Sequence, residues 1–169
     1  MDAAEYRFEN PPDSQPSWLS LAQAVFNGQI TRWETSTCGG GLRWQIYPFN
    51  AGYQYKNTIS TGGLFQLSAR LARYTGNQTY ADWAEKTFDW IFNSPIMAKG
   101  YDKVWDGTTM VNNCSDATQI YWTYNAGTML MGTAFMYNYV KLLPPSVHIH
   151  FSNPNRRMLI PNGTPDSAV

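Results

Sequence analysis

The chain has little charge, few cysteines and no long apolar run. Lysine and arginine total 12, as do aspartate and glutamate, so a basic surface for nucleic acid or anionic lipid is not expected. No apolar run approaches the roughly 20 residues of a membrane-spanning helix. The first ten residues are mixed and charged, unlike a secretory signal peptide. The composition is therefore that of an ordinary globular domain, or of a part of a larger one.

Several catalytic and cofactor motifs are also missing. There is no Gly-x-Ser-x-Gly nucleophile elbow, no Gly-x-Gly-x-x-Gly loop and no Gly-Lys-Ser/Thr phosphate loop. The two histidines, His148 and His150, could share one strand face, but no third ligand lies near them in the sequence. Cys38 has no histidine in its own region. We therefore expect neither a metal nor a cofactor.

The cysteines and glycosylation triplets leave the compartment open. Cys38 and Cys114 are compatible with one disulfide but do not require it. Asn-x-Ser/Thr triplets begin at Asn77, Asn113 and Asn162, and a proline follows the last triplet. Such triplets arise often by chance, so they favour secretion only slightly.

Aromatic residues are abundant, at 15%, and a run of three glycines precedes one dense group of them. Gly39 to Gly41 indicate a tight path or a close approach of the backbone to another group. Aromatic and amide side chains crowd the segment that follows, from Trp44 to Asn57. Flat apolar faces beside neutral hydrogen-bonding groups suit a polyhydroxylated ligand. The alternative is a long ordered loop packed by its own aromatic side chains.

Apolar residues recur at three- and four-residue steps in four segments, which predicts helices. Gly76 fits the left-handed position after the second helix, and Thr79 is predicted to cap the third. The first and third helices are amphipathic and hence outer, whereas the second and fourth are rich in small residues and hence inner. The four predicted helices cover roughly 15–33, 60–74, 79–93 and 124–140.

The chain is therefore predicted to be all-α, with one helical unit used twice and a long aromatic loop before each inner helix. Such units need about three or more copies to close a core, so we expect part of a larger ring. Turn signals between 96 and 121 also allow short strands near Lys103–Trp105. The domain is expected to cover residues 1–140. Residues 141–169 lack a helical period and are expected to form a poorly ordered tail.

Glycosidases normally use two carboxyl groups, so the acids are candidate catalytic residues. Asp82, Glu85 and Asp89 lie opposite the apolar stripe of a predicted helix and are better explained as a solvated face. Asp102 and Asp106 lie in an aromatic loop. Asp106 is kept as a ligand-contacting candidate, although an Asp-Gly pair is also an ordinary turn. The chain contains no pair of consecutive aspartates.

Three polar residues near the helix starts have two interpretations each. Lys56 is a lone lysine among aromatic residues, for which a surface position is the default and the binding of a hydroxyl or carboxylate group is the alternative. Asn57 and Asn125 open the second and fourth helices, where asparagine usually serves as a cap. Both would lie at the same end of the ring, beside Tyr55 and Tyr124, so sugar binding is an equally good interpretation.

Five motifs give the chain a family resemblance. They are Cys-Gly-Gly-Gly-Leu-Arg-Trp-Gln-Ile (38–46), Gly-Tyr-Gln-Tyr-Lys-Asn-Thr-Ile-Ser (52–60), Ala-Arg-Leu-Ala-Arg-Tyr-Thr-Gly-Asn (69–77), Thr-Tyr-Ala-Asp-Trp-Ala (79–84) and Trp-Thr-Tyr-Asn-Ala-Gly (122–127). The chain resembles glycoside hydrolase family 76 from about Met1 to Tyr139. It is more similar to the fungal cell-wall branch of mannan endo-1,6-α-mannosidase-like proteins, which take part in attaching GPI-anchored proteins to wall glucan.

The resemblance implies an (α/α)6 toroid and a retaining mechanism on α-1,6-mannosidic linkages, with an Asp-Asp pair as the carboxyl groups. In the family that pair lies shortly before the segment that begins here at Met1. This chain is therefore expected to be a fragment without catalytic residues, and we expect it not to hydrolyse mannan. Its expected partner is α-1,6-mannan or GPI-core glycan. By the same resemblance, the protein is expected to be secreted or associated with the cell wall or plasma membrane.

The residues that match the glycan-facing loops of the family are the best candidates for holding mannose. Because both cysteines precede inner helices in loops at one end of the ring, we also predict a Cys38–Cys114 disulfide. Two rival interpretations stay open, a glycan-binding module without catalysis and a truncated product that does not fold stably. The candidate sugar-binding residues are Trp44, Tyr55, Lys56, Asn57, Asp106, Tyr124 and Asn125.

Overall fold

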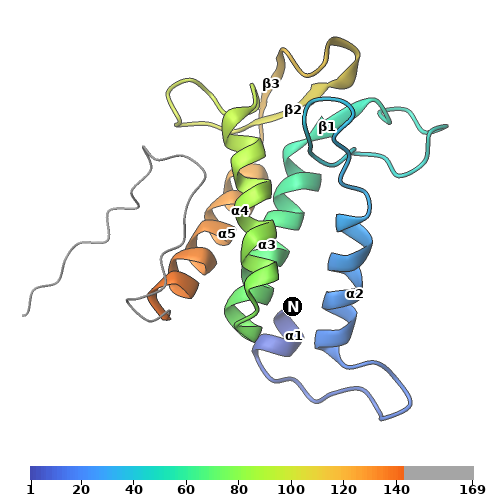
Figure 1. The fold of residues 1–169 in the computed structure, drawn as a ribbon, viewed down its shortest axis with the longest axis vertical. Helices are drawn as coiled ribbons and strands as arrows, with labels where there is room; N and C mark the ends of the chain where they lie inside the picture. Colours follow the sequence, from blue (N-terminus) through green and yellow to red (C-terminus); the bar gives the residue numbers. More distant parts are fainter. Residues whose placement is uncertain (143–169) are drawn as a thin grey trace, which may run out of the picture.

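The computed structural model of the chain describes residues 1–142 and is rich in helices (Figure 1). Each of the four predicted helices is present, with its ends shifted by a few residues. No helix in this part of the chain is long and apolar enough to cross a membrane. The predicted tail beyond residue 142, with both histidines, lies outside the described residues. In chain order the elements are α1 (Asp2–Glu5), α2 (Trp18–Ile30), β1 (Tyr55–Asn57), α3 (Thr58–Thr75), α4 (Gln78–Asn93), β2 (Trp105–Thr109), η1 (Met110–Asn112), β3 (Ala117–Tyr121) and α5 (Thr123–Leu142).

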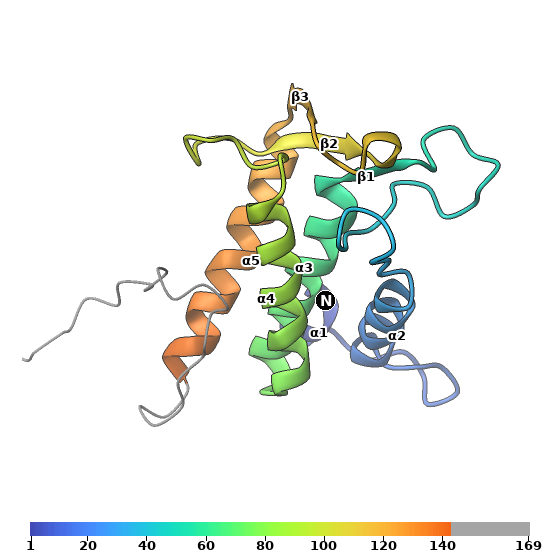
Figure 2. The same cartoon turned by 45° about the horizontal axis from the view of Figure 1, so that its top comes forward.

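Helix α3 lies at the centre of the molecule and contacts α2, α4 and α5 (Figures 1 and 2). Its apolar side chains belong to two separate cores. Leu64 and Leu71 pack with Phe26 of α2, whereas Phe65 and Ala69 pack with α4 and α5. These four side chains of α3 are almost completely removed from solvent. A helix with two buried faces is the kind that the sequence predicts for an inner position.

Helix α5 is less covered than its sequence predicts. Its apolar residues continue nearly all round the helix, which predicts burial on every side. Met129, Gly132 and Met136 are buried, but Leu130 is 72% exposed and Met131 is 43% exposed. In the described part of the chain, α5 packs mainly on α3, so its opposite apolar face stays open to solvent.

The helix ends follow local sequence signals, with one difference from the prediction. Gly76 has a φ of 71° and ends α3 in the left-handed conformation, as predicted. Asn77, and not Thr79, caps α4. The Asn77 Oδ1 accepts a hydrogen bond from the backbone N–H of Thr79 at 2.9 Å. Asparagine is at least as good a cap as threonine, which explains the earlier start of the helix.

The all-α prediction omits a small sheet, although the short strand allowed near Lys103–Trp105 overlaps the start of β2 at Trp105. Strands β1, β2 and β3 form an antiparallel sheet in that order, with Tyr55 opposite Thr109 and Thr108 opposite Ala117. The sheet lies across the end of the helices at which α3 and α5 begin (Figure 2). Because β1 precedes α3 whereas β2 and β3 precede α5, the sheet joins the two long loops.

The glycine run passes closely over two tryptophan rings. Gly40 and Gly41 have φ values of 149° and 86°. A Cβ on Gly40 would lie 2.5 Å from Trp33, and a Cβ on Gly41 would lie 2.5 Å from Trp90. The close backbone approach predicted from the sequence is therefore confirmed, with indole rings as the neighbours.

Replacing Gly41 by alanine should lower the free energy of unfolding by about 2–4 kcal/mol, because the change adds overlap with Trp90 to the strain of a positive φ. Gly39→Ala is the matched control, since Gly39 has a φ of 63° and no atom within 4 Å of the added Cβ. It should lose only about 1–2 kcal/mol for the left-handed conformation. Urea unfolding compares the two variants, and equal losses would contradict the packing explanation.

Candidate functional site

The sheet brings Tyr55 of β1 next to Asp106 of β2. The Tyr55 hydroxyl donates a hydrogen bond to Asp106 Oδ2 at 2.7 Å. The pKa of Tyr55 is raised to about 12, mainly by burial. A hydrogen bond with Thr118 acts against this rise. The hydrogen bond to Asp106 and the charges of Asp106 and Tyr124 add to it. The phenol therefore stays protonated at neutral pH and remains a donor.

A local irregularity in β2 accompanies this contact. The register between β2 and β3 shifts between Trp105 and Gly107, and Asp106 is the residue at that shift. Irregularities of this kind re-aim side chains. Gly107 also matters, because a Cβ there would lie 2.7 Å from Cζ of Tyr55 and 2.5 Å from the carbonyl oxygen of Lys56. The Asp-Gly pair thus belongs to a strand and is not the simple turn that the sequence also allows.

A second pair of aromatic residues is connected to this one through Tyr124, whose charge acts on Tyr55. Trp122, which precedes α5, and Tyr124 in its first turn are stacked, with ring centroids 6.0 Å apart and planes inclined by 14°. They are 45% and 50% exposed. We refer to Tyr55, Asp106, Trp122 and Tyr124 as the sheet-end cluster. It combines flat apolar faces with a carboxylate and phenol hydroxyls.

The sequence predicts three members of the sheet-end cluster but omits Trp122, and it also omits the neighbouring Thr118. Trp122 lies between β3 and α5, only two residues before the predicted site residue Tyr124. This spacing is the signal that could have identified it. Thr118 carries no such signal, because its position beside Tyr55 depends on the pairing of β2 with β3.

Trp44 extends the exposed aromatic surface on the other side of Tyr55. Its N–H donates to the carbonyl oxygen of Tyr55 at 2.8 Å, so the two residues are paired. Paired residues in antiparallel strands lie on the same face. The Trp44 ring covers Gly52 and is 51% exposed. Trp44 therefore keeps the accessibility that sugar contact requires.

Lys56 has a different role from the sugar contact that the sequence predicts. Its side chain is fully buried. Its Nζ donates to the carbonyl oxygens of Glu34, Thr37 and Gly40 at 3.0, 2.9 and 2.5 Å. An ammonium group has three protons, and these three carbonyl oxygens together with the nearby Glu34 carboxylate leave none for a sugar hydroxyl. Lys56 is neither a surface lysine nor a ligand contact, because the preceding loop closes over it.

The Glu34 carboxylate belongs to the same loop and forms ion pairs with Lys56 and Arg43. Its Oε2 lies 3.2 Å from Nζ of Lys56 and 3.2 Å from Nη2 of Arg43. Burial acts to raise the pKa of Glu34, but hydrogen bonds from Ser36, Thr37 and Lys56 outweigh burial and lower the pKa to about 2. Burial lowers the pKa of Lys56, and Glu34 acts against that change. An ion pair thus ties the loop to β1.

Asn57 and Asn125 are both buried, with 3% and 0% of their surface exposed. Asn57 caps α3, because its Oδ1 accepts a hydrogen bond from the backbone N–H of Ser60 at 3.2 Å. This is the structural alternative to sugar binding that the sequence leaves open. Asn125 lies in the first turn of α5, and neither its Oδ1 nor its Nδ2 has a partner within residues 1–142. Buried amides are normally hydrogen-bonded, so Asn125 requires an explanation.

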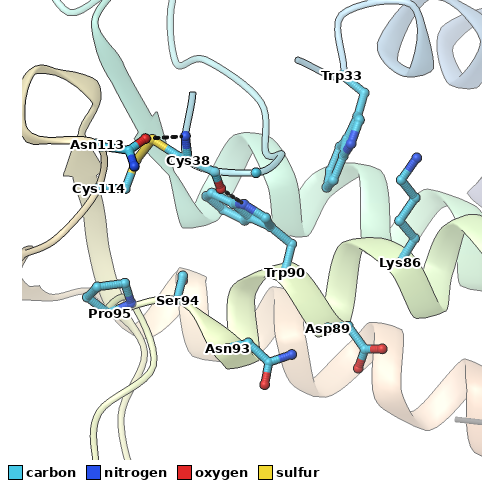
Figure 3. Close-up of a pocket in the computed structure, with 11 residues that line it drawn as sticks. Trp33, Cys38, Lys86, Asp89, Trp90, Asn93, Ser94, Pro95, Asn113 and Cys114 are labelled. Atoms are coloured by element: carbon cyan, nitrogen blue, oxygen red, sulfur yellow. Dashed lines mark hydrogen bonds between the residues drawn. A yellow bond between two sulfur atoms is a disulfide. The ribbon is translucent and has the colours of Figure 1, made fainter. Parts of the chain in front are cut away.

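Cys38 and Cys114 form a disulfide, the pair expected from the sequence. It joins the loop before α3 to the loop before α5 (Figure 3). Cys38 also donates its N–H to Asn113 Oδ1 and accepts from Trp90 Nε1, both at 2.8 Å. A pocket beside the disulfide, named here the α4 pocket, contains none of the residues predicted to hold mannose. Its α4 lining includes Lys86, Asp89, Trp90 and Asn93.

Residues 1–141 match the family described as Glycosyl hydrolase family 76. The chain belongs to this family. A curated relative, the mannan endo-1,6-alpha-mannosidase DCW1 of Saccharomyces cerevisiae, is 54% identical over 140 residues, which are 82% of this chain and 31% of that protein. The family 76 chain thus spans about a third of the length of the curated relatives it matches.

Solved structures share the fold of this family 76 chain. Dfg5 from Chaetomium thermophilum, solved in complex with glucosamine, is 52% identical with a TM-score of 0.79, covering 82% of this chain and 34% of that chain. The second structure is an inactive variant of the alpha-1,6-mannanase GH76A of Salegentibacter sp. HEL1_6, with two consecutive aspartates changed to alanine, in complex with alpha-1,6-mannotetrose. It is 19% identical with a TM-score of 0.62, covering 72% of this chain and 34% of that chain, so this likeness concerns the fold alone.

Replacing Lys56 by methionine, which has a similar length, should lower the free energy of unfolding by about 3–5 kcal/mol. The reason is that Glu34 and three carbonyl oxygens lose their buried cation. Lys103→Met is the matched control, since its side chain is 51% exposed and its pair with Asp102 is 3.8 Å long. The control should change stability by less than about 1 kcal/mol. If urea unfolding finds Lys56→Met as stable as the parent chain, the structural role of Lys56 is wrong.

Proposed function

We propose that this family 76 chain is part of an (α/α)6 toroid, with α3 and α5 as inner helices and α2 and α4 as outer helices. The two buried faces of α3 support an inner position for it. The open apolar face of α5 supports further elements beyond the described residues, because Leu130 and Met131 would be covered in a closed ring. The loops before the two inner helices would then meet at one end of the ring, where the sheet already joins them.

The substrate that we propose is an α-1,6-linked mannoside, held partly by the sheet-end cluster. The observation that carries this proposal is the stacked, half-exposed Trp122–Tyr124 pair beside the hydrogen-bonded Tyr55–Asp106 pair. Aromatic rings can cover the apolar face of a pyranose, and the carboxylate and phenol groups can bind its hydroxyl groups. The name of the DCW1 relative, a mannan endo-1,6-alpha-mannosidase, supports this class of sugar.

The catalytic carboxyl groups are proposed to come from residues outside this chain. Hydrolysis of a glycosidic bond normally needs two carboxyl groups. The resemblance to family 76 implies a pair of consecutive aspartates for this role, and no such pair occurs in this sequence. In the complete protein, one aspartate would attack the anomeric carbon and its neighbour would transfer the proton. The sheet-end cluster would position the sugar and stabilise the oxocarbenium-like transition state.

Asn125 is proposed to complete the same site. Its amide has no hydrogen-bond partner within residues 1–142, although it is fully buried. A buried polar group without a partner costs about 1–3 kcal/mol. In the complete site a water molecule or a sugar hydroxyl would supply that partner, as expected for a residue next to Tyr124 at the start of α5.

A second candidate function is sugar binding without catalysis. It is favoured by one observation, the lack of consecutive aspartates in a chain that nevertheless carries the aromatic cluster. The mannan and GPI-core glycan of the fungal wall would be the partner in either case. The Cys38–Cys114 disulfide agrees with a secreted or cell-surface location, because disulfides persist in oxidising compartments.

The two candidate functions are distinguished by a hydrolysis assay with α-1,6-mannan as substrate. The assay compares this chain with an N-terminally extended form that contains the Asp-Asp pair. We expect the extended form to release sugar and this chain to release none, because only the extended form has both carboxyl groups. Trp122→Ala in the extended form should lower kcat/KM about tenfold, the equivalent of roughly 1.4 kcal/mol of stacking.

Asn93→Ala, which changes the α4 pocket, is the matched control and should leave kcat/KM unchanged. Turnover by this chain alone would refute the proposal that the acids lie outside it. An inactive extended form that still binds α-1,6-mannobiose, measured by tryptophan fluorescence, would favour the binding module.

A further inference from the structure

One of the glycosylation triplets lies in a part of the structure that suits modification. Asn77, Gln78 and Thr79 are exposed residues at the turn between α3 and α4. This turn is at the end of the helices opposite the sheet (Figure 1). Helix α3 has 18 residues, so at about 1.5 Å per residue roughly 27 Å separates the turn from the sheet end. A bulky group attached here would leave the sheet-end cluster accessible.

The hydrogen bonds of Asn77 leave the relevant nitrogen available. Its Oδ1 accepts from the N–H of Thr79, and its own N–H donates to the Thr75 hydroxyl at 3.2 Å. None of the hydrogen bonds described for Asn77 uses Nδ2, the atom that carries an N-linked glycan. Because modification of Nδ2 keeps Oδ1 as an acceptor, Asn77 could be glycosylated and still cap α4.

The triplet at Asn113 has a different environment. Its Oδ1 accepts the Cys38 N–H at 2.8 Å, a contact that joins the two long loops. The middle residue of the triplet is Cys114, which forms the disulfide (Figure 3). Asn113 also lines the α4 pocket. A glycan on Asn113 would therefore lie against a cross-linked loop junction. The third triplet, at Asn162, lies outside the described residues.

We propose that Asn77 is an N-glycosylation site of this protein and that Asn113 is not. In the reaction, Nδ2 of Asn77 forms a bond to the anomeric carbon of an oligosaccharide carried on a lipid pyrophosphate. The bond from that carbon to the phosphate oxygen breaks, the lipid pyrophosphate leaves with the electron pair, and Nδ2 loses one proton. The product is a solubilising surface glycan at the end of the molecule away from the sugar-binding loops.

The test is glycopeptide mapping of the complete chain, produced in yeast behind a cleavable secretion signal. Peptide N-glycosidase in heavy-oxygen water converts each glycosylated asparagine to a labelled aspartate, which mass spectrometry locates. We expect the label at Asn77 in most molecules and no label at Asn113. Thr79→Ala should remove the label while Asn77 still caps α4, and Thr79→Ser, the matched control, should keep it.

An unlabelled Asn77, a label at Asn113 as abundant as that at Asn77, or a label that persists in Thr79→Ala would each overturn the proposal. The readout does not depend on mannan hydrolysis, so it is separate from a failure of the proposed function.

Discussion

The buried ammonium group of Lys56 is the contact on which the loop end of the molecule depends. It binds three carbonyl oxygens and the Glu34 carboxylate from one short loop, while its backbone belongs to β1. The desolvation of a charge is costly, so this arrangement is stable only when all of its partners are in place. Since β1 leads directly into α3, the same lysine fixes the loop to the start of the central helix.

The second loop is fixed to the first by covalent and packing contacts. The Cys38–Cys114 disulfide joins them, and Trp90 of α4 donates its indole N–H to the backbone of Cys38. The glycine run lets the first loop lie directly on Trp33 and Trp90. With both loops held, the sheet can form between them and bring Tyr55 next to Asp106. The exposed aromatic surface is thus built by contacts that are themselves buried.

Much of the helical part could be predicted from the sequence, because apolar spacing and the helix-ending Gly76 are local signals. The sheet could not, since β1 and β2 are more than 45 residues apart and their pairing depends on the loop contacts. The sequence allowed Lys56 to bind a carboxylate, which Glu34 supplies, but its burial and its three carbonyl acceptors could not be predicted because only the folded loop provides them. Asn57 acts as the cap that local sequence rules allow. Tyr55, Asp106 and Tyr124 are brought together, as their loop positions suggest.

The distinction between the sheet-end cluster and the α4 pocket can be tested most directly by nuclear magnetic resonance. Backbone amide spectra of the isotope-labelled chain would be recorded during titration with α-1,6-mannobiose. We expect the signals of Tyr55, Asp106 and Tyr124 to shift with increasing sugar, while those of Trp90 and Asn93 stay in place. Shifts confined to Trp90 and Asn93, or no shift at any of the five residues at saturating sugar concentrations, would contradict the assignment of the sheet end as the sugar-binding surface.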